Sequence, residues 1–269
     1  MNHDKICNAI TKDSNDDFDA LYRLLYARGF LVEKDEKGIV MSDNAYDESR
    51  SMRNPSEHSD LPSDWRTLIQ AMGNMIHIEE DHIVSCTDQF SREHPYDVLF
   101  CEKIGFESLW FLYKSPLNRF KRITAFPAKL MTMELEPFVA MYVKAVSAIQ
   151  LETILSCQGH VDKQDCPLYI TFANHFYTAF HNALWATDTV LRDLGLIWRT
   201  SKNEISIKLN GETADDIYVN VIKAGQYIYE NRINIREMRK TIANQLTKDD
   251  ENLSVEDLTK RMITLIEHI

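Results

Sequence analysis

Apolar residues recur at helical spacing in several separate stretches of this chain. The first predicted helix begins at a cap on Asn15 or Asp16 and ends near Arg28, with Gly29 at the stop position. Its apolar face is formed by Phe18, Leu21, Tyr22 and Leu25. The same spacing predicts further helices over 65–74, 102–113, 137–149, 176–194, 214–230, 235–246 and 254–269. The last of these begins at Ser254, and Asp257 stands three residues later as in a capping box.

Short runs rich in β-branched and aromatic residues stand between these helices. They predict strands at 30–32, 39–41, 152–157, 168–172, 197–200 and 205–209, and apolar residues between 76 and 84 also suggest strand. Glycine and proline are both scarce, with 8 and 7 residues, which favours helices over a many-stranded architecture. We therefore expect a helix-rich α+β protein with short antiparallel hairpins between helices.

The pattern also suggests three portions along the chain. Residues 1–63 form an acidic helix-plus-hairpin portion, which ends in a polar stretch that we expect to be an exposed loop. Residues 64–213 form the α+β main body. Residues 214–269 form a helical C-terminal segment, whose last helix has an apolar stripe suited to packing on the body or on a second copy.

Acidic residues are concentrated in the first part of the chain. The net charge is −11, and the first hundred residues hold 20 acidic and 10 basic side chains, whereas residues 101–269 hold 21 and 20. This balance argues against general affinity for nucleic acid, which needs a cationic surface. It predicts either a solvated acidic surface or a surface that meets a basic partner.

The five cysteines form no regular framework, and the N-terminal residues include no apolar run typical of a secretory signal. No window has the length and apolar character of a membrane span. We expect a cytoplasmic protein with free thiols and no membrane contact.

The candidate for chemistry is a corner at Cys157. His160 follows three residues later, then Cys166, then His175, and Gly159 allows a tight bend between the first two. Thiolate and imidazole groups are zinc ligands, so these four residues predict one structural zinc if residues 152–157 and 168–172 pair as a hairpin.

Two alternatives to zinc stay open at this corner. In one, Cys157 is a buried structural cysteine and no cofactor is bound. In the other, Cys157 is a catalytic thiol beside His160, with Asp162 orienting the imidazole ring. The second alternative would make the protein a metal- or thiol-dependent hydrolase or nuclease.

The stretch 151–172 resembles a local pattern in uncharacterised proteins of bacteria and their phages. The similar residues are Ser-Cys-x-Gly-His, ending at His160, and Tyr-Ile-x-Phe, ending at Phe172. The resemblance implies a small helix–hairpin unit in a bacterial or mobile-element setting, and it implies no reaction.

Other histidines fit a metal site less well. His77 and His82 are five residues apart, so neither a helix nor a strand brings them to one face, although His77, Glu79 and Asp81 would share one face of a strand. His175 and His181 are six apart on a predicted helix and cannot share one site.

Two basic sets stand out in the acidic chain. One lies in the stretch 114–129 and the other along the helix that follows Asn231. Their members are Lys114, Arg119, Lys121, Arg122 and Lys129, and then Arg232, Arg236, Arg239 and Lys240. They predict contact with nucleic acid or a partner, or ion pairing with the protein's own acids.

No phosphate-binding glycine loop, nucleophile elbow or H-E-x-x-H motif occurs in the sequence. Because no complete catalytic set is present, we expect a non-catalytic protein-binding or regulatory protein of bacterial or phage origin. It would inhibit or regulate a host complex, such as a defence complex, and would form homo-oligomers through its C-terminal helices.

Overall fold

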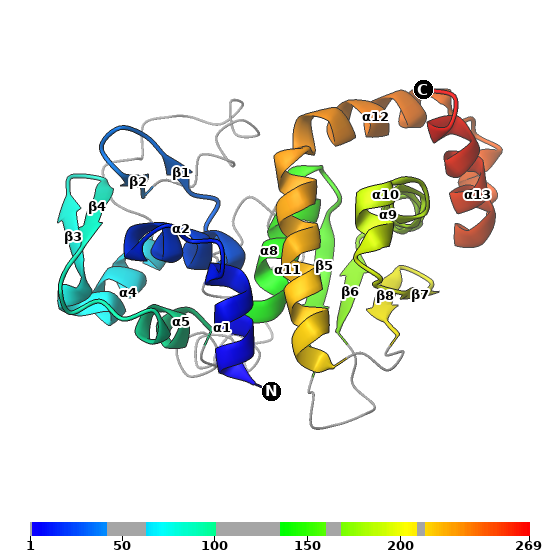
Figure 1. Ribbon diagram of the computed structural model, residues 1–269. Helices are drawn as coiled ribbons and strands as arrows, with labels where there is room; N and C mark the ends of the chain where they lie inside the picture. Colours follow the sequence, from blue (N-terminus) through cyan, green and yellow to red (C-terminus); the bar gives the residue numbers. More distant parts are fainter. Residues whose placement is uncertain (1, 42–62, 101–134, 160–167, 209–212) are drawn as a thin grey trace, which may run out of the picture. The chain divides into compact units, whose positions relative to one another are not determined.

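A computed structural model describes residues 2–41, 63–100, 135–159, 168–208 and 213–269. Helices and two small antiparallel four-stranded sheets make up this part of the chain, which confirms the predicted α+β class (Figure 1). The chain divides into two compact units, Met1–Met141 and Tyr142–Ile269. This division differs from the three predicted portions, which stay a prediction. Among the described helices, none has the length and apolar character needed to cross a membrane.

The first unit surrounds helix α2 with short helices and a sheet in the order β1-β2-β4-β3. Its elements are α1 (His3–Thr11), α2 (Asp17–Arg28), β1 (Glu33–Lys34), β2 (Ile39–Val40), α4 (Ser63–Met72), the 3₁₀ helix η3 (Gly73–Met75), β3 (Ile76–Glu79), β4 (His82–Cys86) and α5 (Glu93–Phe100). Helix α8 (Pro137–Ala148) spans the division between the units. Sequence periodicity did not predict α1, and the predicted helix 102–113 lies outside the described residues.

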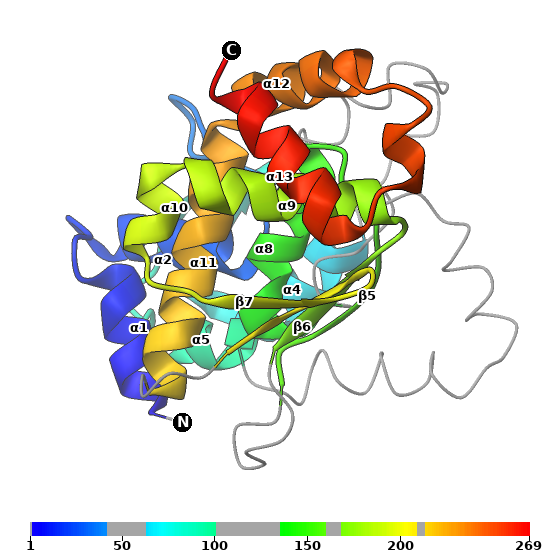
Figure 2. The ribbon, with the colours of Figure 1, turned by 90° about the vertical axis from the view of Figure 1, so that its right-hand side faces the viewer.

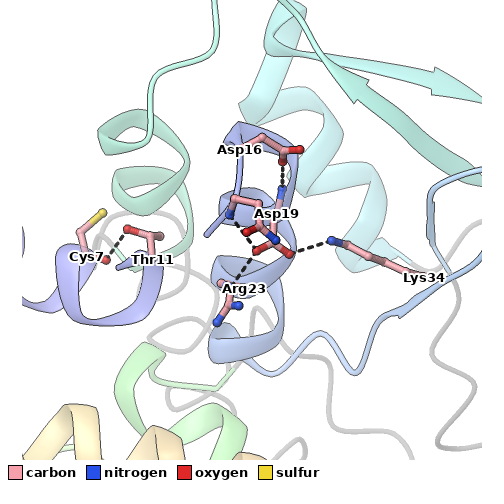
Figure 3. Close-up of polar contacts among 7 residues, drawn as sticks. Cys7, Thr11, Asp16, Asp19, Arg23 and Lys34 are labelled. Atoms are coloured by element: carbon pink, nitrogen blue, oxygen red, sulfur yellow. Dashed lines mark hydrogen bonds and ion pairs between the residues drawn. The ribbon is translucent and has the colours of Figure 1, made fainter. Parts of the chain in front are cut away.

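Helix α2 begins and ends where its caps predict. The Asp16 side chain accepts the backbone N–H of Asp19 at 2.7 Å, and Gly29 ends the helix in the left-handed conformation, at φ 97°. Asp19 in turn pairs with Arg23 at 3.0 Å and with Lys34 of β1 at 2.9 Å (Figure 3). These contacts tie β1 to the first turn of α2.

Arg28, at the other end of α2, is fully buried. Its Nε donates to the carbonyl of Leu99 at 2.6 Å, and its Nη2 donates to the carbonyl of Leu135 at 2.9 Å. Because a buried guanidinium must be hydrogen-bonded, these bonds join α2 to the end of α5 and to the segment before α8.

The second unit packs helices on one face of the sheet β5-β6-β8-β7. Its elements after α8 are β5 (Thr153–Cys157), β6 (Tyr169–Phe172), α9 (His175–Thr187), α10 (Thr189–Asp193), β7 (Trp198–Ser201), β8 (Glu204–Ile207), α11 (Ala214–Glu230), α12 (Arg232–Gln245), the 3₁₀ helix η6 (Asp250–Asn252) and α13 (Val255–Ile266). Buried and half-buried side chains alternate strictly along β6 and β8. The buried ones are Ile170, Phe172, Ile205 and Ile207.

Helix α13 packs on α9. Figures 1 and 2 both show α9 over the sheet and α13 beside it. The apolar stripe of α13 is buried there through Leu258, Met262 and Leu265. Ser254 caps the helix as predicted, accepting the N–H of Asp257 at 3.1 Å. Of the two predicted alternatives, packing on the body or on a second copy, the structure shows the stripe packed on α9 of the body.

The predicted helix 176–194 is in fact two helices, separated at Asp188. This residue is extended, at φ −80° and ψ 120°, and its carboxylate accepts the N–H of Leu191 at 3.0 Å. Aspartate competes well as an N-cap, so the chain starts a new helix, α10, instead of continuing α9. Asp188 also accepts the hydroxyl of Tyr227 at 2.8 Å, which fixes the break against α11.

Candidate functional site

The hairpin predicted at the Cys157 corner is present. Strand β5 pairs with β6, with Cys157 opposite Tyr169, and Gly159 has the positive φ of 83° expected at the bend. Cys157 is half-buried, and its Sγ accepts the N–H of Gly159 at 3.4 Å. His160, Asp162 and Cys166 lie outside the described residues, so the zinc and thiol hypotheses stay predictions.

His175 is the other predicted zinc ligand that the structure describes, and it lies on the same helix as His181. His175 begins α9 and is half-buried, whereas His181 is 1% exposed in the core. Of the residues that the structure describes, no three His, Cys, Asp or Glu side chains are arranged to hold a metal ion. His77, Glu79 and Asp81 are therefore not grouped in this way.

The basic helix α12 uses its arginines inside the second unit. Arg236 donates to the carbonyl of Ala148, at the end of α8, at 2.6 Å, and Arg239 donates to the side chain of Gln150. Arg232 lies over the ring of Tyr229, 4.3 Å from its centre. Burial, together with the neighbouring charge of Arg236, lowers the pKa of Arg239.

Lys240 differs from these arginines. It is exposed and pairs with Glu237 of its own helix at 2.7 Å. The arginines of α12 therefore act at least partly as structural donors, and the other predicted basic set, 114–129, lies outside the described residues.

A buried polar network in the second unit was not predicted. The hydroxyl of Tyr142 accepts the indole N–H of Trp185 at 2.7 Å and lies 2.7 Å from Nε2 of His181. Because the indole N–H can only donate, the Tyr142 hydroxyl accepts from Trp185 and donates its own hydrogen to Nε2 of His181. The ring hydrogen of His181 is then on Nδ1 and points to the side-chain oxygen of Asn182. Burial lowers the pKa of His181 to about 3, so this ring is neutral at physiological pH.

The rings of this network pack closely. His181 contacts Phe172 and Trp198 at ring-centre distances of 5.5 and 5.1 Å. The arrangement satisfies buried polar groups and fixes α8 and α9 on the sheet. We interpret it as structural.

The first unit has two hairpins, β1–β2 and β3–β4 (Figure 1), and these hairpins carry a concentrated set of carboxylates. We call it the acidic hairpin surface. Its members are all exposed: Glu33, Asp35 and Glu36 from the β1–β2 hairpin, and Glu79, Glu80 and Asp81 from the β3–β4 hairpin. The two hairpins are joined because β2 pairs with β4, with Val40 opposite His82.

Side-chain contacts confirm that the two hairpins lie within reach of each other. His82 of β4 is 7% exposed, and its Nε2 lies 2.9 Å from the carboxylate of Asp35. Lys37 lies 4.0 Å from Glu80 across the same gap. Gly38 makes the close approach possible, because it has φ 150° and a Cβ there would overlap the carbonyl of Ile83.

Few cations offset these six carboxylates. Lys34 is turned to Asp19 and stacks over the ring of Tyr22 at 4.5 Å, so it neutralises the start of α2 instead (Figure 3). Its hydrogen bond, with that of Arg23, outweighs partial burial and lowers the pKa of Asp19. Among the described ion pairs, Lys37 is the one lysine that reaches the acidic hairpin surface, and its contact is long.

His82 is the charge-sensitive member of this surface. The hydrogen bond with Asp35 raises the pKa of His82 and lowers that of Asp35. Its Nδ1 also lies 2.7 Å from Asp81, an ion-pair contact whose geometry falls short of a hydrogen bond. The protonated ring is therefore held between two carboxylates. When it loses its proton at higher pH, the net negative charge of the acidic hairpin surface increases.

Sequence reasoning placed His77, Glu79 and Asp81 on one face of a strand but missed the contact of His82 with Asp35. The two residues are 47 positions apart, so no local periodicity links them. An acidic turn after each of two neighbouring strand patterns was the available signal. Comparison of the chain with protein-family models, curated proteins and solved structures found no match.

Proposed function

We propose that this protein acts without catalysis, by binding another protein, and that the acidic hairpin surface meets a basic region of that partner. The observation that supports this proposal is the gathering of six exposed carboxylates, which are offset among the described ion pairs by one long lysine contact and by the histidines His77 and His82. Like charges placed together repel one another at short range, and a cationic partner would relieve that repulsion.

A surface of this kind acts mainly on recognition. A concentrated negative field speeds the encounter with a basic partner and excludes acidic ones, including nucleic acid. The regulatory part of the proposal, inhibition or control of a host complex in a bacterial or phage setting, depends on the resemblance around Cys157 alone.

The experiment compares the wild-type protein, as bait in a bacterial lysate, with two charge-neutralised variants. The test variant carries Glu36→Gln, Glu79→Gln and Glu80→Gln. The control variant removes the same number of exposed charges from the second unit, through Asp249→Asn, Glu251→Gln and Glu267→Gln.

The captured protein is then purified and titrated against each bait. Because an exposed charge pair contributes up to about 1 kcal/mol, the test variant should bind roughly tenfold or more weakly. The control variant should match the wild type, and wild-type affinity should fall as salt is added. Equal affinity of the test variant and the wild type would refute the role of this surface.

A further inference from the structure

Strand β5 differs from the other edge strands of the two sheets. Within the part of the chain that the structure describes, both sheets are open, with β1, β3, β5 and β7 at their edges. Three of these strands carry a charged residue or a histidine and glutamate pair, which blunts pairing with other chains. Strand β5, with the sequence Thr-Ile-Leu-Ser-Cys, carries no charged residue.

Two large apolar side chains are exposed side by side on this strand. Ile154 is 47% exposed and Leu155 is 39% exposed. The pairing with β6 is irregular between Thr153 and Leu155, which is a bulge that breaks the alternation of the strand. Leu155 lies opposite Thr171, on the face of the sheet away from buried Phe172, so the exposure follows from the register.

The last helix offers no comparable apolar surface. Its stripe, which the sequence suggested for self-association, is buried on α9 through Leu258, Met262 and Leu265. Among the described edge strands, β5 exposes two large apolar side chains within the strand itself, whereas at β7 the exposed Ile197 stands directly before the strand, which carries Arg199.

The sequence around β5 suits antiparallel pairing with itself. If the twofold axis passes at Leu155, the middle of the strand, Leu155 lies opposite Leu155 of the copy. Thr153 then lies opposite Cys157, and Ile154 opposite Ser156. Glu152, the nearest acid, lies opposite Gln158, so no like charges meet.

We infer that β5 is a self-pairing edge, where a second copy of this chain adds its own β5 antiparallel and joins the two sheets into one. A twofold contact of this kind is isologous, since the same strand serves both partners. Five residues on each side bury far less than the roughly 1,200 Å² of a stable interface. The dimer should therefore be weak and dependent on concentration.

Disulfide trapping tests the register directly. In a Cys157→Ser background, the variant Leu155→Cys should form an intermolecular disulfide under mild oxidation, because the two sulfurs face each other across the axis. The matched control, Val190→Cys, places a thiol at a similarly exposed apolar position on α10, where Val190 is 46% exposed. The Cys157→Ser protein alone serves as the blank for its remaining cysteines.

Sedimentation supplies a second measurement that needs no cysteine. The average mass of the wild-type protein should rise with concentration, and Leu155→Lys should abolish the rise by placing two ammonium groups together. Val190→Lys should leave it unchanged. A wild-type mass that stays monomeric at all concentrations, or equal trapping at 155 and 190, would overturn the inference, as would self-association that Leu155→Lys does not reduce.

Discussion

Replacing Arg28 by methionine tests the claim that one buried guanidinium joins three segments of the first unit. Methionine keeps most of the apolar stem but removes every donor. The carbonyls of Leu99 and Leu135, now bonded at 2.6 and 2.9 Å, would both lose a partner in a site that water does not reach.

The expected loss follows from those two bonds. A hydrogen bond from a charged group contributes about 1.5–3 kcal/mol, and an acceptor left buried without a donor costs a similar amount. Refilling the space with the methionine side chain recovers part of the loss. We therefore expect unfolding of the first unit to become easier by about 3–5 kcal/mol, a large fraction of the stability of a typical domain.

The assay must report on the first unit alone. Trp65 is 2% exposed and packs on Phe30 with ring centres 4.9 Å apart, so its fluorotryptophan NMR signal during urea unfolding follows this unit. The matched control is Arg23→Met on the same helix, which removes a half-exposed ion pair with Asp19. Surface pairs contribute about 0–1 kcal/mol. If the Arg28 variant loses no more stability than the Arg23 variant, the assigned role of Arg28 is wrong.

Three further changes test other parts of the structure. Gly38→Ala should cost about 1–3 kcal/mol and speed amide exchange at the β2–β4 pairing, because the added Cβ overlaps the Ile83 carbonyl. Tyr142→Phe leaves His181 Nε2 and an indole N–H without partners, so urea unfolding of the second unit should become easier by about 2–4 kcal/mol. For His82, whose folded-state pKa is raised, the stabilisation is fully present below about pH 6.5 and is lost as pH rises through the folded value. The urea midpoint should therefore fall as the pH rises above about 6.5, and His82→Gln should remove this dependence.

The sequence predicted those features that depend on neighbouring residues. The caps at Asp16 and Ser254 and the glycine stop at Gly29 were read correctly because a cap bonds within three or four positions. The β5–β6 hairpin was also predicted, since its two strand patterns flank a short polar loop. The break at Asp188 was missed because the apolar stripe continues through it.

Features that depend on distant residues were not predictable in this way. The spacing rule separated His175 from His181 correctly, but it gave no sign that His181 bonds to Tyr142, 39 residues earlier. The arginines of α12 were predicted to contact a partner or nucleic acid, or to pair with the protein's own acids, whereas Arg236 bonds to a backbone carbonyl 88 residues away. A periodic pattern shows which side of a helix is polar, but it does not show which acceptor lies opposite.

The burial of α13 on α9 has a consequence for synthesis of the chain. The face of α9 that receives Leu258 and Met262 is complete long before those residues leave the ribosome, so a nascent chain presents apolar surface until its final helix emerges. Contacts between such distant segments also form late in folding, because the loop between them must close first. Nascent chains stalled before Ser254 should therefore recruit chaperones that the finished protein no longer needs.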